Sequence, residues 1–111
     1  MPDQLPVVRG TLDMLVLKAL TWKPMHSLEI IAWLEDRSDG RFGVDDSALL
    51  QAFHRMEERG LVAASWAMTP KNRRARYYKM TPKGRAHLKK EMDKLAEYNE
   101  MLSSILGAES P

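Results

Sequence analysis

The sequence predicts a mainly α-helical domain with a small β-wing, the class of a winged helix-turn-helix with a two-stranded β-wing and a long C-terminal helix. Three observations predict it. Apolar residues recur at helical spacing in four segments, and two short segments of alternating polarity lie between the third and the fourth. The helix before these two segments has clear start and stop signals, as in a helix-turn-helix followed by a wing.

The composition limits the classes of protein that the chain can represent. Its 111 residues suffice for one domain, and 17 basic against 15 acidic residues give a net charge of only +2. The absence of cysteine excludes a disulfide framework, a thiolate zinc site and a cysteine nucleophile. No apolar run approaches the roughly 20 residues that span a bilayer, and no secretory leader is recognisable. We therefore expect a soluble, cytoplasmic protein without membrane contact.

The first two helices are expected to supply most of the core. Residues 1–8 contain two prolines and are predicted to form an irregular arm. The first helix is expected from Thr11, with apolar residues on one face at Leu12, Leu15, Val16, Ala19 and Leu20. Pro24 disfavours its continuation. The second helix has a predicted apolar arc of Leu28, Ile30, Ile31 and Leu34, with Trp33 at its rim.

The third helix, predicted over residues 47–59, combines an apolar stripe with a polar face. Either Asp45 or Asp46 is expected to cap it, and Gly60 is expected to end it in the left-handed conformation. The predicted buried stripe consists of Leu49, Ala52, Phe53 and Met56. The polar face consists of Ser47, Gln51, His54, Arg55 and Glu58. Glutamine and arginine can read base edges, and serine can hold a phosphate, so this face is a candidate recognition surface; an ordinary solvated face is the alternative.

The segment from Gly60 to Gly84 reads as two strands joined by a basic turn over residues 69–74. Seven cations and no acidic residue occur from residue 71 to residue 85: Lys71, Arg73, Arg74, Arg76, Lys79, Lys83 and Arg85. A stiff ribbon with arginines near its tip can follow DNA phosphates or enter a minor groove. A loop kept soluble by its charge is the alternative. The expected wing contacts with DNA are Lys71, Arg73, Arg74 and Arg76.

Thr81 and Pro82 predict the start of the last helix, as an N-cap followed by proline at the first helical position. Its apolar residues repeat at alternating spacings of four and three, which is typical of a coiled-coil seam. The predicted dimer interface consists of Leu88, Met92, Leu95, Asn99, Leu102 and Leu106. We therefore expect a homodimer, with residues 1–81 as the DNA-binding domain and residues 82–111 as the dimerisation helix and tail.

The sequence contains candidates for two further kinds of site. Four large side chains could line a hydrophobic effector site between subunits, with ordinary packing as the alternative: Trp22, Trp33, Met92 and Tyr98. His54 and Glu57 lie three residues apart on a helix, but a metal site needs three or four converging ligands. No cofactor and no enzymatic activity are therefore expected.

The chain resembles the PadR-like winged-helix transcriptional regulators over about residues 8–95. Five motifs in order carry the resemblance: Arg9-Gly10-Thr11-Leu12, His26, the segment LLQAFHRME at residues 49–57, Gly60-Leu61-Val62 through Trp66, and the segment RYYKMTPKG at residues 76–84. The single helix after the wing is similar to the short branch of the family, whose members dimerise through it.

This resemblance implies a bacterial regulator, usually a repressor, that binds an inverted repeat with the third helix in the major groove and the wing beside the minor groove. Two family tyrosines that hold the phosphate backbone are replaced here by Leu28 and Leu50. Their loss predicts weaker operator affinity, or compensation by Ser47, Gln51 and the wing. An assembly module that binds protein instead of DNA is the alternative function.

Overall fold

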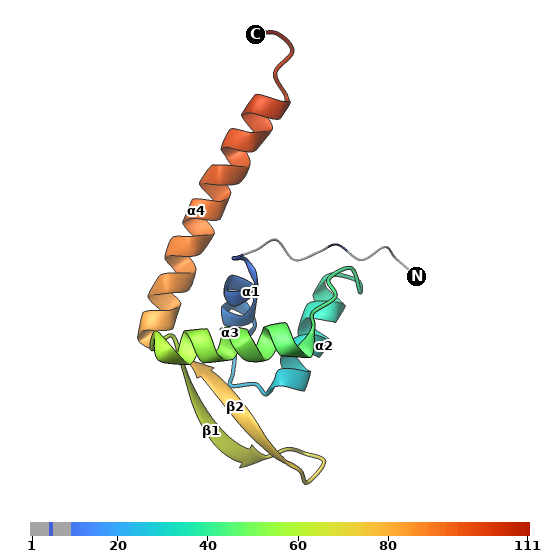
Figure 1. The fold of residues 1–111 in the computed structure, drawn as a ribbon, viewed down its shortest axis with the longest axis vertical. Coiled ribbons are helices and arrows are strands. Elements are labelled where there is room, and N and C mark those ends of the chain that lie inside the picture. The colour runs from blue at the N-terminus through green and yellow to red at the C-terminus, as the bar shows by residue number, and fades with distance from the viewer. Residues whose placement is uncertain (1–4, 6–9) are drawn as a thin grey trace.

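The computed structural model describes Leu5 and residues 10–111, so the predicted arm at residues 1–8 lies almost wholly outside the described residues. The elements follow in the order α1 (Leu12–Ala19), α2 (Ser27–Arg37), α3 (Asp46–Glu58), β1 (Val62–Met68), β2 (Arg74–Met80) and α4 (Pro82–Leu106). Three helices form a compact body, the hairpin extends from one side of it, and α4 leaves from the other side (Figure 1). This arrangement confirms the predicted fold class.

Helix α1 is the central helix of the body, because it contacts α2, α3 and α4. Leu17 is fully buried although the predicted apolar face did not include it. The periodic pattern identified one face only, whereas a helix that packs against three others buries more than one face. The expected residues Val16, Ala19 and Leu20 are also in the core.

Helices α2 and α3 begin with side-chain caps. His26 caps α2, since its Nδ1 accepts the Glu29 amide at 3.4 Å and its own amide donates to the Glu29 carboxylate at 3.3 Å. Asp45 caps α3 by accepting the Ser47 amide at 3.0 Å. The prediction that Leu28 belongs to the buried arc of α2 is wrong, because its side chain is 69% exposed. At 100° per residue it lies about 140° from the middle of the Ile30 and Leu34 stripe.

The hairpin is antiparallel, and its base is fixed to the body. Val62 pairs with Met80 and Ala64 with Tyr78 on the face that enters the core. The Tyr78 ring stacks on Phe53 of α3 with ring centroids 3.7 Å apart. The backbone of Met25 adds a single bridge at Tyr78, with hydrogen bonds of 3.1 and 2.9 Å. The base of the wing therefore has little freedom to rotate against α3.

Helix α4 begins inside the body and ends outside it. Thr81 caps it by accepting the Gly84 amide at 3.0 Å, as predicted, and also donates to the Gly60 carbonyl at 2.6 Å. Gly84 and Leu88 are its only buried residues. Its C-terminal half projects away from the other helices (Figure 1). No helix in the described part of the chain is both long and apolar enough to cross a membrane.

Candidate nucleic-acid interface

The outward face of α3 is narrower than the predicted polar face. At 100° per residue, Ser47, Gln51, His54 and Glu58 lie within about 30° of the direction opposite the buried stripe, whereas Arg55 does not. All four side chains are exposed. Leu50 is 53% exposed and lies about 70° from that direction, on the same side as Glu57. The centre of the face is therefore polar, with an apolar side chain on one edge.

Arg55 lies on the other edge of α3, where it is paired within the chain. Its Nη2 is 2.7 Å from a carboxylate oxygen of Asp13 on α1. The hydrogen bond to Asp13 raises the pKa of Arg55, against a smaller opposing effect of burial. Arg55 therefore ties α3 to α1. Helical spacing alone groups Arg55 with the outward residues of α3, because this spacing contains no information about the carboxylate that α1 supplies.

The tip of the wing is a tight turn that exposes its cations. The Thr69 carbonyl accepts the Asn72 amide at 2.9 Å, and the Thr69 amide donates to the Arg73 carbonyl at 2.7 Å. Asn72 has a φ of 61°, a left-handed conformation that asparagine tolerates better than most residues. Lys71 and Arg73 are exposed on this turn. Within the described chain, no carboxylate lies within ion-pair distance of Lys71, Arg73 or Arg74.

Arg76 differs from these three cations, because it is paired with α3. Its Nη2 is 3.0 Å from the Glu57 carboxylate. Tyr78 lies nearby, and burial raises its pKa; the negative charge of Glu57 adds to this rise and the positive charge of Arg76 opposes it. The Arg76–Glu57 ion pair therefore joins the middle of the wing to the end of α3.

Trp66 is a residue of this surface that the sequence reasoning missed. It pairs with Arg76 across the hairpin, and its ring lies 4.7 Å from the guanidinium of Arg74 and 5.9 Å from that of Arg76. The signal was present in the sequence, since the register of a short hairpin places Trp66 and both arginines on one face.

The predicted dimer seam is largely exposed in the single chain. From Met92 to the end of α4, no side chain is buried. The exposed large apolar residues of this segment are Met92, Leu95, Tyr98, Met101, Leu102, Ile105 and Leu106. Leu88 differs from the rest of the predicted seam, since it is only 6% exposed and belongs to the core of its own chain. Its burial is explained by packing within the chain.

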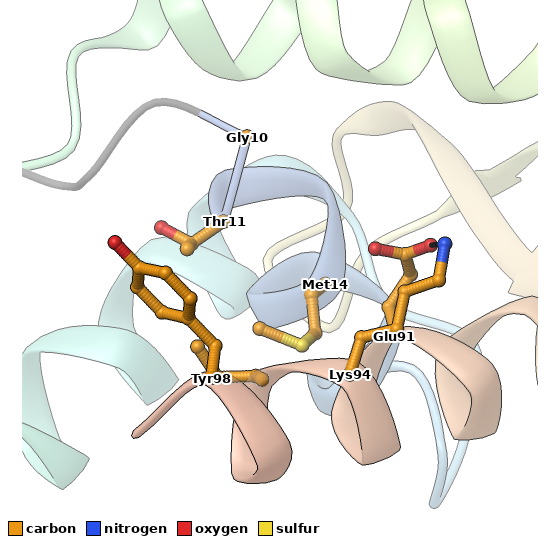
Figure 2. A pocket seen from close by; sticks show the side chains of 7 residues that line it. Gly10, Thr11, Met14, Glu91, Lys94 and Tyr98 are labelled. Carbon is orange, nitrogen blue, oxygen red and sulfur yellow. Dashed lines mark ion pairs between the residues drawn. The ribbon is translucent and has the colours of Figure 1, made fainter. Parts of the chain in front are cut away.

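A shallow hollow of about 300 Å³ lies between the start of α1 and the middle of α4. Figure 2 shows Met14 and Tyr98 beside it, with the Glu91–Lys94 ion pair at one end. Of the four predicted effector residues, only Tyr98 lines this hollow. Trp22 and Trp33 instead form a separate aromatic pair with ring centroids 5.5 Å apart, and Met92 is exposed on α4. The structure therefore does not bring the four together.

No group of three or more histidine or acidic side chains suited to a metal ion occurs among the residues that the structure describes. His54 is exposed on α3, and the carboxylate of Glu57 is engaged by Arg76.

Comparison with known proteins identifies the family. The model of the PadR-like transcriptional regulator family matches residues 16–90. A PadR family transcriptional regulator from Eggerthella lenta is 26% identical, with a TM-score of 0.76 over 88% of this chain and 83% of that chain. A transcriptional regulator from Clostridium thermocellum has the same fold, with a TM-score of 0.76 and 23% identity over 90% of this chain and 93% of that chain.

An uncharacterized protein from Lysinibacillus sphaericus is 25% identical over 90% of this chain and 92% of its own length. The family match spans both the helix-turn-helix and the wing, and it agrees with the prediction that the chain is not an enzyme. The chain therefore belongs to the PadR-like family of transcriptional regulators.

Proposed function

We propose that the chain is a sequence-specific DNA-binding repressor that acts as a homodimer on an inverted repeat. One observation carries this proposal: the exposed polar face of α3 lies next to a wing whose tip carries three cations without an ion-pair partner among the described residues, Lys71, Arg73 and Arg74. Together, α3 and the wing can bind a DNA duplex, since a helix fits the major groove and cations contact the phosphates. Repression would follow from occupation of promoter DNA.

The α4 helix supports the dimer. A second copy is the simplest cover for the exposed apolar residues from Met92 to Leu106, because they continue at helical spacing beyond the body of the chain. Their segment and the wing project in different directions from the body (Figure 1). Pairing through α4 would leave both wings free. A symmetric dimer would then present two recognition helices to two half-sites.

Leu50 supports a more specific reading of the recognition face. An exposed leucine beside Gln51 can contact the methyl group of thymine, while glutamine can bind adenine through two hydrogen bonds. The exposed Leu28 and Leu50 also suit the alternative function, an assembly module that binds another protein. Binding to a purified duplex with no other protein present distinguishes the two functions.

A hydrophobic effector would bind in the hollow lined by Met14, Leu95 and Tyr98, and the partner's α4 would close its open side. The probe is the fluorescent dye 1-anilinonaphthalene-8-sulfonate, whose aromatic rings bind apolar surfaces, titrated into the dimer. Tyr98→Ala is expected to lower the saturable signal, whereas Trp22→Phe, which changes a residue outside the hollow, is expected to leave it unchanged. Equal signals from both variants would contradict this location.

The test of DNA binding is selection of duplexes from a random library, followed by fluorescence anisotropy at several salt concentrations. The three unpaired cations at the wing tip, in each of two chains, predict a slope of log K against log salt of about −5, from about 0.9 per neutralised phosphate. Arg74→Ala is expected to weaken binding to selected and random duplexes alike, whereas Gln51→Ala is expected to weaken binding to the selected duplex more than to random ones.

Lys90→Ala is the matched control, because Lys90 is an exposed cation on α4, distant in sequence from the wing. It is expected to change neither affinity nor slope. A wild-type chain that shows no preference for any selected duplex, or binding that does not weaken as salt rises, would contradict the proposal.

A further inference from the structure

The outer half of the wing carries an exposed cation–aromatic cluster. The hairpin register places four pairs on the face that enters the core: Val62 with Met80, Ala64 with Tyr78, Trp66 with Arg76, and Met68 with Arg74. The pairs near the base are largely buried against the body, whereas Trp66 and Met68 are more than half exposed. The same face thus changes from core to a surface of one indole and two guanidinium groups.

The two guanidinium groups of this cluster have different partners. Arg76 lies between the Trp66 ring, at 5.9 Å, and the Glu57 carboxylate, at 3.0 Å. Arg74 is closer to the ring, at 4.7 Å, and has no ion-pair partner within the described chain. Arg76 is therefore held from α3, whereas Trp66 is the contact that restrains the charged end of Arg74.

Such a contact changes how easily an arginine binds a phosphate. A free arginine side chain loses rotamer entropy when it is fixed on a ligand, and an aromatic face that already holds it reduces this loss. The planar guanidinium can stack on a ring and still direct its N–H groups at an anion. An indole beneath Arg74 therefore suits a cation that must reach a phosphate in one orientation.

We propose that Trp66 is a positioning residue for DNA binding: its indole holds the Arg74 guanidinium for a phosphate, while the Arg76–Glu57 ion pair fixes the wing against α3. The inference rests on the proposed DNA-binding function and adds to it a residue that acts through Arg74 and makes no contact with DNA itself.

The test is a double-mutant cycle measured on a random-sequence duplex, since phosphate contacts do not depend on sequence. Trp66→Leu keeps an apolar side chain but removes the ring in both chains of the dimer. It is expected to weaken binding about 5- to 30-fold, which is the effect of about 2- to 5-fold for one exposed cation–π contact applied in each chain. Trp66→Phe keeps an aromatic ring and is expected to lose less affinity than Trp66→Leu. In an Arg74→Ala background, Trp66→Leu is expected to cause no further loss.

The salt dependence separates positioning from a merely structural role. If Arg74 no longer reaches its phosphate, Trp66→Leu reduces the slope by up to about 0.9 per chain, as Arg74→Ala does. Thermal unfolding checks that the variants remain folded. Should Trp66→Leu unfold, Arg74→Lys carries the test, because it keeps the charge and Trp66 but removes the planar group, and it is expected to lose affinity.

Additive losses in the cycle, or Trp66→Leu binding as tightly as the wild type, would overturn the inference. So would full affinity of Arg74→Lys where that variant carries the test. A wild-type chain that binds no duplex would instead overturn the proposed function, and this inference with it.

Discussion

Replacing Gly84 by alanine should destabilise the chain although alanine is the better helix former. A Cβ atom at Gly84 would lie 2.1 Å from the Leu61 carbonyl oxygen and 3.0 Å from the Met80 Cγ. That oxygen is backbone and accepts the Thr81 amide at 3.1 Å, so it cannot rotate away without loss of this bond. Overpacking of this kind costs about 1–3 kcal/mol, and the lost hydrogen bond about 1 kcal/mol more. The higher helix propensity of alanine offsets only about 1 kcal/mol of this loss of stability.

Gly84→Ala is therefore expected to lower the free energy of unfolding by about 1–3 kcal/mol. Each kcal/mol lowers Tm by roughly 4 °C. Circular dichroism at one fixed protein concentration measures it, because dimerisation makes Tm depend on concentration. Arg85→Ala is the control, since Arg85 is exposed at the next position and its change should stay within about 0.5 kcal/mol. A Gly84→Ala chain as stable as the wild type would refute the reasoning that α4 packs tightly against the Leu61 backbone, just before β1, at this point.

The remaining predictions concern the dimer, the core and the recognition helix. Leu102→Asp should shift the protein to monomers in sedimentation and weaken operator binding, while the fold of each chain is kept because Leu102 is outside the core; a stable dimer would contradict the α4 interface. The raised pKa of Tyr78 contributes stability that is present below about pH 10, the ordinary tyrosine value, and is lost as pH rises through the folded value, so Tyr78→Phe should lose less stability on alkaline titration. Replacing single thymines of the selected duplex by uracil should weaken binding of the wild type at one or more positions, whereas binding of Leu50→Ala should be unaffected. Equal losses of affinity for both proteins would refute the methyl contact.

Local signals in the sequence were sufficient for most of the fold. Caps at Asp45 and Thr81, the stop at Gly60 and the alternation in the hairpin are all encoded within a few residues, and each lies where it was predicted. Leu17 and Leu28 were misjudged because burial depends on how many neighbours surround a helix, and the periodicity of one helix does not contain this information.

The candidate site was harder to predict than the fold, because its chemistry depends on partners that are distant in sequence. Arg55 pairs with Asp13, 42 residues away, and Arg76 with Glu57, 19 residues away. The count of cations was visible in the sequence, but the division into paired and unpaired arginines was not. Trp66 is a different case, because the register of the short hairpin alone places it on one face with Arg74 and Arg76.

The proposed function requires two copies of α3 and the wing to bind one duplex. Hydroxyl-radical footprinting of the dimer on a selected duplex tests this most directly. Two equivalent protected segments related by two-fold symmetry are expected, with centres about 10 base pairs apart or a multiple of that spacing. A single unsymmetric footprint, or equal protection along the whole duplex, would contradict it.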